Sequence, residues 1–152
     1  MYFRNPNYFG SRSPIQEGRD VEKSILGAVP WQRLPEIFRS ARHQNPEAEE
    51  APKPLSTQEI KDLINKLKQL HLPLEVFPTL LIETIQKNWQ EWMKEEKSRP
   101  ETEIKEAKFI PCVDTQLDDL GIDAIVEFLP ADETQEPIRI GLDITSNPGK
   151  CQ

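Results

Sequence analysis

The chain has 152 residues, of which 36% are hydrophobic and 14 are proline, and its formal net charge is −7. No apolar run approaches the roughly 20 residues that a membrane-spanning helix needs, which excludes a spanning protein. Residues 1–10 lack the apolar stretch of a secretory signal, and two cysteines are too few for a disulfide framework. We therefore expect a cytoplasmic protein.

The charge divides the chain into a basic N-terminal part and an acidic remainder. Residues 1–43 contain seven Lys or Arg and four Asp or Glu, a net charge of +3, so residues 44–152 carry −10. A basic arm on an acidic body is typical of proteins that contact a polyanion or a partner. An arm that folds back onto its own acidic domain explains the same layout equally well.

The N-terminal part predicts a tail followed by two short helices. Residues 1–19 have no helical or strand period, and we interpret them as a flexible basic tail with aromatic residues that can dock a partner. Within residues 20–43 we expect one helix over 21–28, with Asp20 as its N-cap. A second helix is expected over 34–42, with Pro35 in its first turn.

A linker and two longer helices follow. Residues 44–55 are rich in Pro and Glu and predict a linker. The capping-box pattern that begins at Ser56 predicts a helix from residue 57 to about residue 70. A longer helix is expected over 79–97, and the two helices form an antiparallel hairpin or pack on the sheet that follows.

Strand patterns dominate the last part of the chain. Candidate strands cover residues 108–113, 121–128 and 138–145, and the polar loop between the last two favours a hairpin. The predicted fold class is α+β. N-terminal helices and a helical hairpin pack on a small, three-stranded, mainly antiparallel sheet, with residues 56–152 as the folded domain.

Two acids lie in the last two candidate strands at a spacing that suits a shared site. Asp123 opens one strand, Asp143 lies near the end of the next, and the hairpin between them brings the two positions to one edge of the sheet. This pattern resembles the PD-(D/E)XK restriction-endonuclease-like superfamily. The alternative is structural, because Asp143 alternates with apolar neighbours and can simply occupy the solvent face of a half-buried strand.

The resemblance implies a magnesium-dependent nuclease site. It would place metal-binding acids at Asp123 and Asp143 and a further acid at Glu83 on the preceding helix. Carboxylates suit Mg²⁺, which would activate water and stabilise charge on phosphoryl oxygens. Where the family has a lysine, this sequence has Thr145, and Lys150 is the candidate replacement among the catalytic residues Asp123, Asp143 and Lys150.

Two functions follow as expectations. The first is a divergent nuclease-like module, active or inactive, that binds or processes nucleic acid with a divalent metal. Its core is incomplete, because the family fold continues with a helix and a strand beyond this sequence. The alternative is a non-catalytic adaptor that binds a partner protein through its tail or helical hairpin. The unfinished sheet edge predicts a homodimer or a hetero-complex, and no membrane partner is expected.

Overall fold

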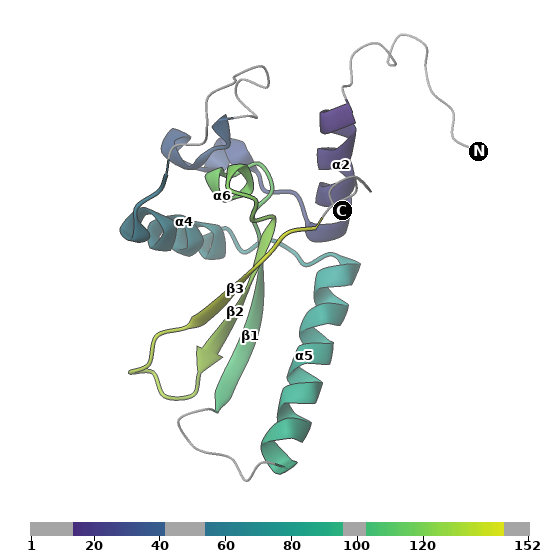
Figure 1. Cartoon of the computed structure of the whole chain (residues 1–152), viewed down its shortest axis with the longest axis vertical. Helices are drawn as coiled ribbons and strands as arrows, with labels where there is room; N and C mark the ends of the chain where they lie inside the picture. Colours follow the sequence, from purple (N-terminus) through teal and green to yellow (C-terminus); the bar gives the residue numbers. More distant parts are fainter. Residues whose placement is uncertain (1–13, 42–53, 96–102, 145–152) are drawn as a thin grey trace, which may run out of the picture.

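The structure is a computed structural model that describes residues 14–41, 54–95 and 103–144 (Figure 1). Among the described residues, three α-helices and two short 3-10 helices precede the first strand, and one further helix lies between the first two strands. The elements are α2 (Pro14–Leu26), the short 3-10 helices η1 (Trp31–Arg33) and η2 (Glu36–Phe38), α4 (Thr57–Gln69), α5 (Val76–Glu95), β1 (Ile104–Pro111), α6 (Gln116–Asp119), β2 (Ala124–Pro130) and β3 (Ile138–Leu142). Among these described residues, no helix is both long and apolar enough to cross a membrane.

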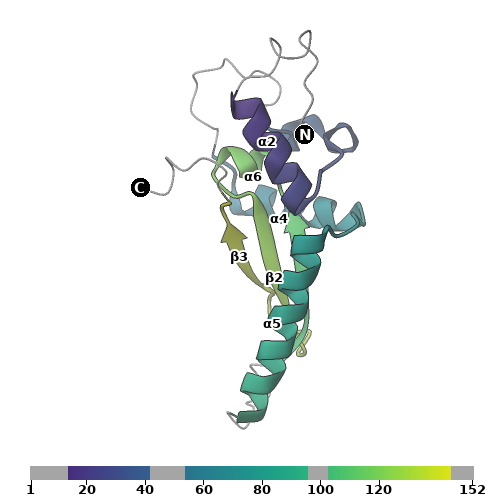
Figure 2. The same ribbon diagram turned by 90° about the vertical axis from the view of Figure 1, so that its right-hand side faces the viewer.

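The three strands form one antiparallel sheet in the order β1-β2-β3 (Figure 1), and α5 runs along one side of this sheet (Figure 2). Phe109 of β1 lies opposite Val126 of β2, which in turn lies opposite Ile140 of β3. A β-bulge interrupts the β1–β2 register between Ile104 and Glu106. The α+β class and the small antiparallel sheet are therefore confirmed.

Each face of the sheet carries its own hydrophobic core. Side chains alternate across a strand, so Ile110 and Ile125 share one face, whereas Phe109 and Val126 share the other. The first pair packs with Leu63, Ile64 and Leu67 of α4, and we call this side the α4 face. The second pair packs with Leu26 of α2 and Ile82 of α5, and we call this side the α5 face.

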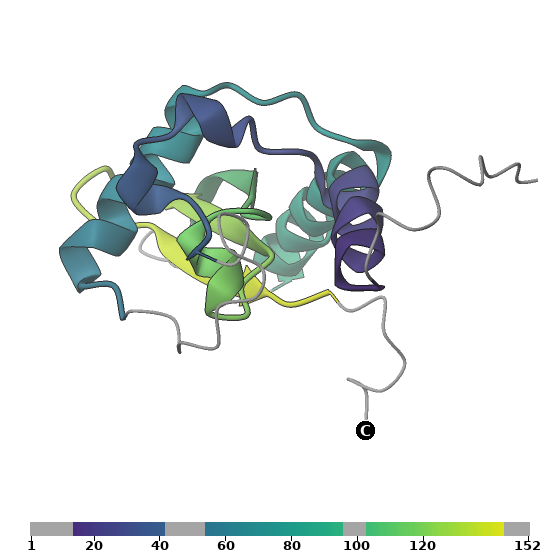
Figure 3. The same cartoon turned by 90° about the horizontal axis from the view of Figure 1, so that it is seen from above.

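The helices α4 and α5 lie on either side of the sheet, as the view from above shows (Figure 3). They do not form a hairpin that packs on one face, because both sheet faces are apolar and each helix covers one. The α4 helix begins where the sequence predicted: Ser56 Oγ accepts from the amide of Glu59, and the Glu59 carboxylate accepts from the amide of Ser56. The α5 helix begins at Val76 rather than residue 79.

The first helix differs from the prediction at both ends. It begins at Pro14, so residues 14–19 belong to α2 and not to a tail, and Asp20 lies inside the helix instead of capping it. Proline suits the first turn of a helix, where its missing N–H has no intrahelical partner. The helix ends at Leu26 because Gly27 adopts a φ of 110°, and its amide donates to the carbonyl of Lys23.

The predicted helix over residues 34–42 is wrong. The described part of that segment instead forms η2, and Arg39 then makes an isolated β-bridge to Thr115. The guanidinium of Arg39 donates to the carbonyls of Trp31 and Leu34 at 3.0 and 3.1 Å, and it stacks 4.9 Å from the centre of the Trp31 ring. These contacts close two short turns and stop a longer helix from forming. Residues 42–53, which include most of the predicted linker, lie outside the described residues.

The strands have different ends from those predicted. β1 begins at Ile104, and residues 112–123 form the loop that contains α6 rather than strand. β2 begins at Ala124, and β3 ends at Leu142. The hydrophobic pattern alone does not distinguish strand residues from the buried loop between β1 and β2, because residues 112–115 are also buried.

Candidate functional site

Three carboxylates meet at the end of the sheet where β2 begins. Glu22 comes from α2, Asp118 from α6 and Asp123 from the residue before β2, and one oxygen atom of each lies within 4.8 Å of the others. Glu22 and Asp123 are buried, and Asp118 is half-buried. We call these three residues the acidic triad.

The loop between β1 and β2 places Asp118. The hydroxyl of Thr115 accepts from the amide of Leu117 and so caps α6. Gly121 follows with a φ of 89°, which lets the chain leave the helical turn and enter β2. The carboxylate of Asp118 accepts from the amide of Asp114 at 3.0 Å, which fixes its orientation next to the start of β2.

Asp123 is bound to both neighbouring strand ends. Its carbonyl accepts from the amide of Cys112, and its own amide donates to the carbonyl of Leu142 at 2.8 Å. Its carboxylate also accepts from the amide of Ile144 at 2.9 Å. The side chain is therefore held by the segment that follows β3.

The surroundings of Asp123 disfavour its charged form. Burial is the main cause, and a hydrogen bond with Asp118 and the negative charges of Glu22 and Asp118 add to it, raising the pKa of Asp123 to about 8. The amide of Ile144 acts in the opposite direction. Burial and the charges of Asp118 and Asp123 also raise the pKa of the Cys112 thiol. The net effect favours the protonated form of Asp123, because a shared proton lets the carboxylates of Asp123 and Asp118 lie close together.

A lysine lies close to this loop. Lys23, the residue after Glu22 in α2, makes a 2.5 Å ion pair with Asp114, whose side chain is fully buried. Asp114 has a φ of 69°, a left-handed conformation that Asp tolerates better than most residues. The ion pair joins α2 to the loop that carries Asp118, so it holds together the two segments from which the acidic triad is built.

The structure brings together only some of the site residues expected from the sequence. Asp123 belongs to the acidic triad. Asp143 is exposed, and although its backbone lies between the two residues that bond Asp123, its side chain is not part of the triad. Glu83 is exposed on α5 and is also not in the triad. Lys150 and Thr145 lie outside the described residues.

Two members of the triad were missed in the sequence. Asp118 could have been predicted to lie near Asp123, because it precedes Asp123 by five residues and a Leu-Gly turn between them reverses the chain. Glu22 had none, because 96 residues separate it from Asp118 and nothing in one sequence pairs such distant positions. The expected helical acid was assigned to Glu83 because α5 directly precedes the sheet in the chain.

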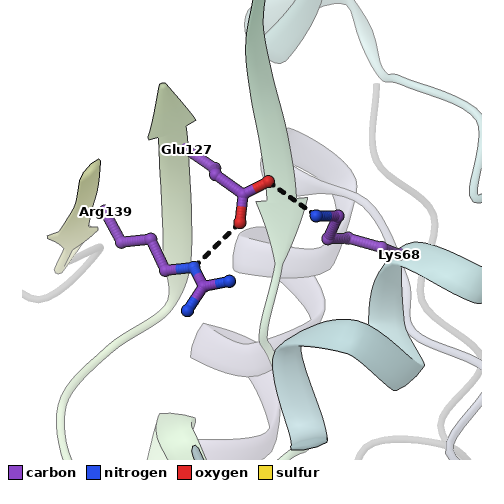
Figure 4. Close-up of polar contacts among 3 residues, drawn as sticks. All are labelled: Lys68, Glu127 and Arg139. Atoms are coloured by element: carbon purple, nitrogen blue, oxygen red, sulfur yellow. Dashed lines mark hydrogen bonds and ion pairs between the residues drawn. The ribbon is translucent and has the colours of Figure 1, made fainter. Parts of the chain in front are cut away.

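A second buried carboxylate, Glu127, has a structural explanation (Figure 4). Its side chain is fully buried in β2 on the α4 face and accepts from Lys68 of α4 and Arg139 of β3, each at 2.8 Å. Burial raises the pKa of Glu127, but the hydrogen bonds and charges of Lys68 and Arg139 outweigh it, so the pKa is lower than usual. Both carboxylate oxygens are bonded, and the cluster ties α4 to two strands.

The acidic triad thus combines burial, close approach of like charges and a carboxyl with a raised pKa, whereas the Glu127 cluster is neutralised by its own cations. Compared with family models, with curated proteins and with solved structures, the chain shows no match.

Proposed function

We propose that this chain is a divergent nuclease-like module that holds a divalent cation, with Mg²⁺ as the working ion, and binds or processes nucleic acid. The observation that carries the proposal is the acidic triad. The resemblance of the sequence to the PD-(D/E)XK superfamily assigned Asp123 to a metal site. Independently of that resemblance, oxygen atoms of two further carboxylates lie within 4.8 Å of an oxygen of Asp123.

The donor set suits a small, hard cation. Mg²⁺ prefers oxygen ligands and is commonly bound through one or two carboxylates together with water and substrate phosphates. The three carboxylates repel one another at this short distance, and the raised pKa of Asp123 reflects that repulsion together with burial. A divalent cation would relieve this repulsion and would displace a proton held by these carboxyls.

The protein groups around the triad have separate roles in this proposal. When bound, the cation would activate water and stabilise charge on phosphoryl oxygens. The amide of Ile144 orients Asp123, and the amide of Asp114 orients Asp118. Lys23 neutralises Asp114 and keeps α2, with Glu22, against the loop.

The charge distribution and the cysteine content complete the proposal. An acidic body repels a phosphate backbone, so the bound cation and the net charge of +3 on residues 1–43 must compensate. The few cysteines favour a reducing compartment, and we place the protein in the cytoplasm on that ground. A homodimer or a hetero-complex remains the predicted assembly.

The test separates cation binding from folding. Mg²⁺ or Mn²⁺ is titrated into the full chain, and binding is measured by calorimetry and by the shift in thermal unfolding. The wild type should bind the cation, and Asp123→Asn and Glu22→Gln should not. Glu91→Gln, an exposed substitution on α5, is the matched control and should bind as the wild type does. Cation-dependent binding or cleavage of DNA and RNA is then compared in the same variants. Equal cation binding by Asp123→Asn and the wild type would contradict the assignment.

A second candidate is the non-catalytic adaptor, and one observation favours it. Four large apolar side chains near the start of α5 are exposed: Leu74, Val76, Phe77 and Leu80, with Val76 at 75%. Exposed apolar side chains that lie together commonly mark protein-binding surfaces. Capture of a partner protein is measured for the full chain and for two variants. One variant lacks residues 1–13, and the other is the double substitution Val76→Ser/Leu80→Ser. Loss in only one of the two variants identifies the surface used, and unchanged capture in both removes this candidate.

A further inference from the structure

The outer edge of β1 offers unpaired backbone groups. Within the described residues, β1 pairs with β2 on one side and with no strand on the other. The amide of Cys112 donates to the carbonyl of Asp123, and hydrogen-bonded residues alternate along an antiparallel strand. Lys108 therefore directs its N–H and C=O toward β2, whereas Ala107 and Phe109 direct theirs toward the outer edge.

Two cavities follow this edge. One, of about 360 Å³, lies between the end of α4, the side of α5 and residues 106–111. The other, of about 180 Å³, lies between residues 85–90 of α5 and residues 104–107. The two share Gln86, Glu106 and Ala107 in their walls, so together they form one groove along β1, which we call the β1 groove.

The β1 groove is basic although the body of the protein is acidic. Its walls contain Lys68, Lys105 and Lys108 and a single acid, Glu106. Lys68 is paired with the buried Glu127, so Lys105 and Lys108 are the lysines left to attract a ligand, against the single acid Glu106, whereas residues 44–152 as a whole carry a net charge of −10. A basic groove in an acidic body attracts acidic segments of other molecules.

The two sides of the β1 groove differ in polarity. Lys108 lies on the α4 face, near Lys68, because it is paired with Glu127 in the register. Ala107 and Phe109 lie on the α5 face, near Ile82. A strand placed against β1 would therefore meet lysines on one face and apolar side chains on the other.

We propose that the β1 groove binds an extended segment of a partner protein, which pairs with β1 as a fourth strand. Its side chains alternate between acidic residues on the α4 face and apolar residues on the α5 face. The N–H and C=O groups of Ala107 and Phe109 provide four main-chain hydrogen bonds for this strand. The inference does not depend on the cation at the acidic triad.

Other occupants fit the β1 groove less well. In the antiparallel register that places Lys108 of one copy opposite Lys108 of the other, the β1 strand of a second copy would bring like charges together, which is destabilising. A nucleic acid would use the lysines through its phosphates, but it does not present alternating N–H and C=O groups at strand spacing to Ala107 and Phe109. Only an extended peptide supplies donors, acceptors and negative charge in strand spacing.

The test uses two synthetic hexapeptides, capped at both ends, that alternate Glu with Val and Lys with Val. Titrated into the ¹⁵N-labelled full chain, the Glu-Val peptide should saturate at millimolar concentration and shift the amide signals of β1 and the facing side of α5. It should also slow hydrogen exchange at Ala107 and Phe109. Lys108→Glu should weaken this binding roughly fivefold and favour the Lys-Val peptide instead. Lys87→Glu, an exposed change on α5 away from both cavities, is the matched control and should leave the affinity unchanged.

A backbone control distinguishes strand pairing from simple charge attraction. Two N-methylated forms of the Glu-Val peptide are made, one methylated at the amides of the Glu residues and the other at the amides of the Val residues. One form should lose binding and the other should keep it, because only alternate amides face β1. Equal binding of the Glu-Val and Lys-Val peptides overturns the proposal, as does equal binding of the two methylated peptides. Absence of saturable binding also overturns it. If a single-stranded oligonucleotide, and not the Glu-Val peptide, shifts the amides of Ala107 and Phe109, the groove is a nucleic-acid site and the proposal fails.

Discussion

Replacing Asp123 by Asn tests the reasoning about the acidic triad most directly. The pKa of this carboxyl rises from 3.8 to about 8 on folding, so between these pH values the folded state holds a proton that the unfolded state lacks. Raising the pH through this window therefore favours unfolding, by up to about 1.4 kcal/mol per pH unit. From pH 5 to pH 7 the free energy of unfolding should fall by up to about 2.7 kcal/mol. That loss lowers the Tm by roughly 10 °C in a domain of this size.

Glu127 does not confuse this measurement. Its pKa is lowered from 4.5, so the stability it contributes is complete above that value and is lost only as the pH falls further. The pH range in which Glu127 changes the free energy of unfolding thus lies below pH 5. A change of stability within this range reports on the acidic triad.

The assay is urea unfolding of the wild type and of Asp123→Asn at pH 5, 6 and 7, without divalent cations and with a chelator present. An Asn side chain can still accept from the amide of Ile144 but cannot ionise, so the loss of stability with rising pH should disappear in the variant. Asp143→Asn, an exposed change nearby, should keep the wild-type dependence. A wild type that gains stability from pH 5 to pH 7, or an Asp123→Asn variant that keeps the wild-type slope, would refute the reasoning.

Three further predictions concern stability at pH 7, each measured by urea unfolding. Glu127→Gln leaves the cations of Lys68 and Arg139 without their buried partner, so it should cost about 3 kcal/mol; a loss under about 1 kcal/mol would mean that water already screens the cluster. Ser56→Ala removes one bond of the capping box and should cost about 1 kcal/mol, which is contradicted if the free energy of unfolding is unchanged. Gly27→Ala should cost about 1–2 kcal/mol through its φ of 110°, because an added Cβ would meet no atom closer than 3.7 Å. A stabilised Gly27→Ala protein would show that the helix end can rearrange.

Local patterns predicted much of the fold. The capping box at Ser56 located the start of α4, because both of its hydrogen bonds form within one turn. The apolar alternation and the polar loop predicted the β2–β3 hairpin, since neighbouring strands need only a short connection to meet. The predictions failed where distant contacts decide the conformation. Arg39 forms a β-bridge with Thr115 where a helix was predicted, and α2 is longer than its apolar pattern indicated.

The sequence alone determined the fold class and the main helices, and it singled out one member of the acidic triad, Asp123. All of these follow from hydrogen bonds and side-chain periods that span a few residues. Only the tertiary structure decided that Glu22 joins Asp118 and Asp123, because α2 reaches the start of β2 through its packing on α5 and its ion pair to the loop. It also decided which sheet edge is lined by lysines and, among the described residues, unpaired. Neither result is encoded in any local pattern, because each depends on which faces of distant elements are buried against each other.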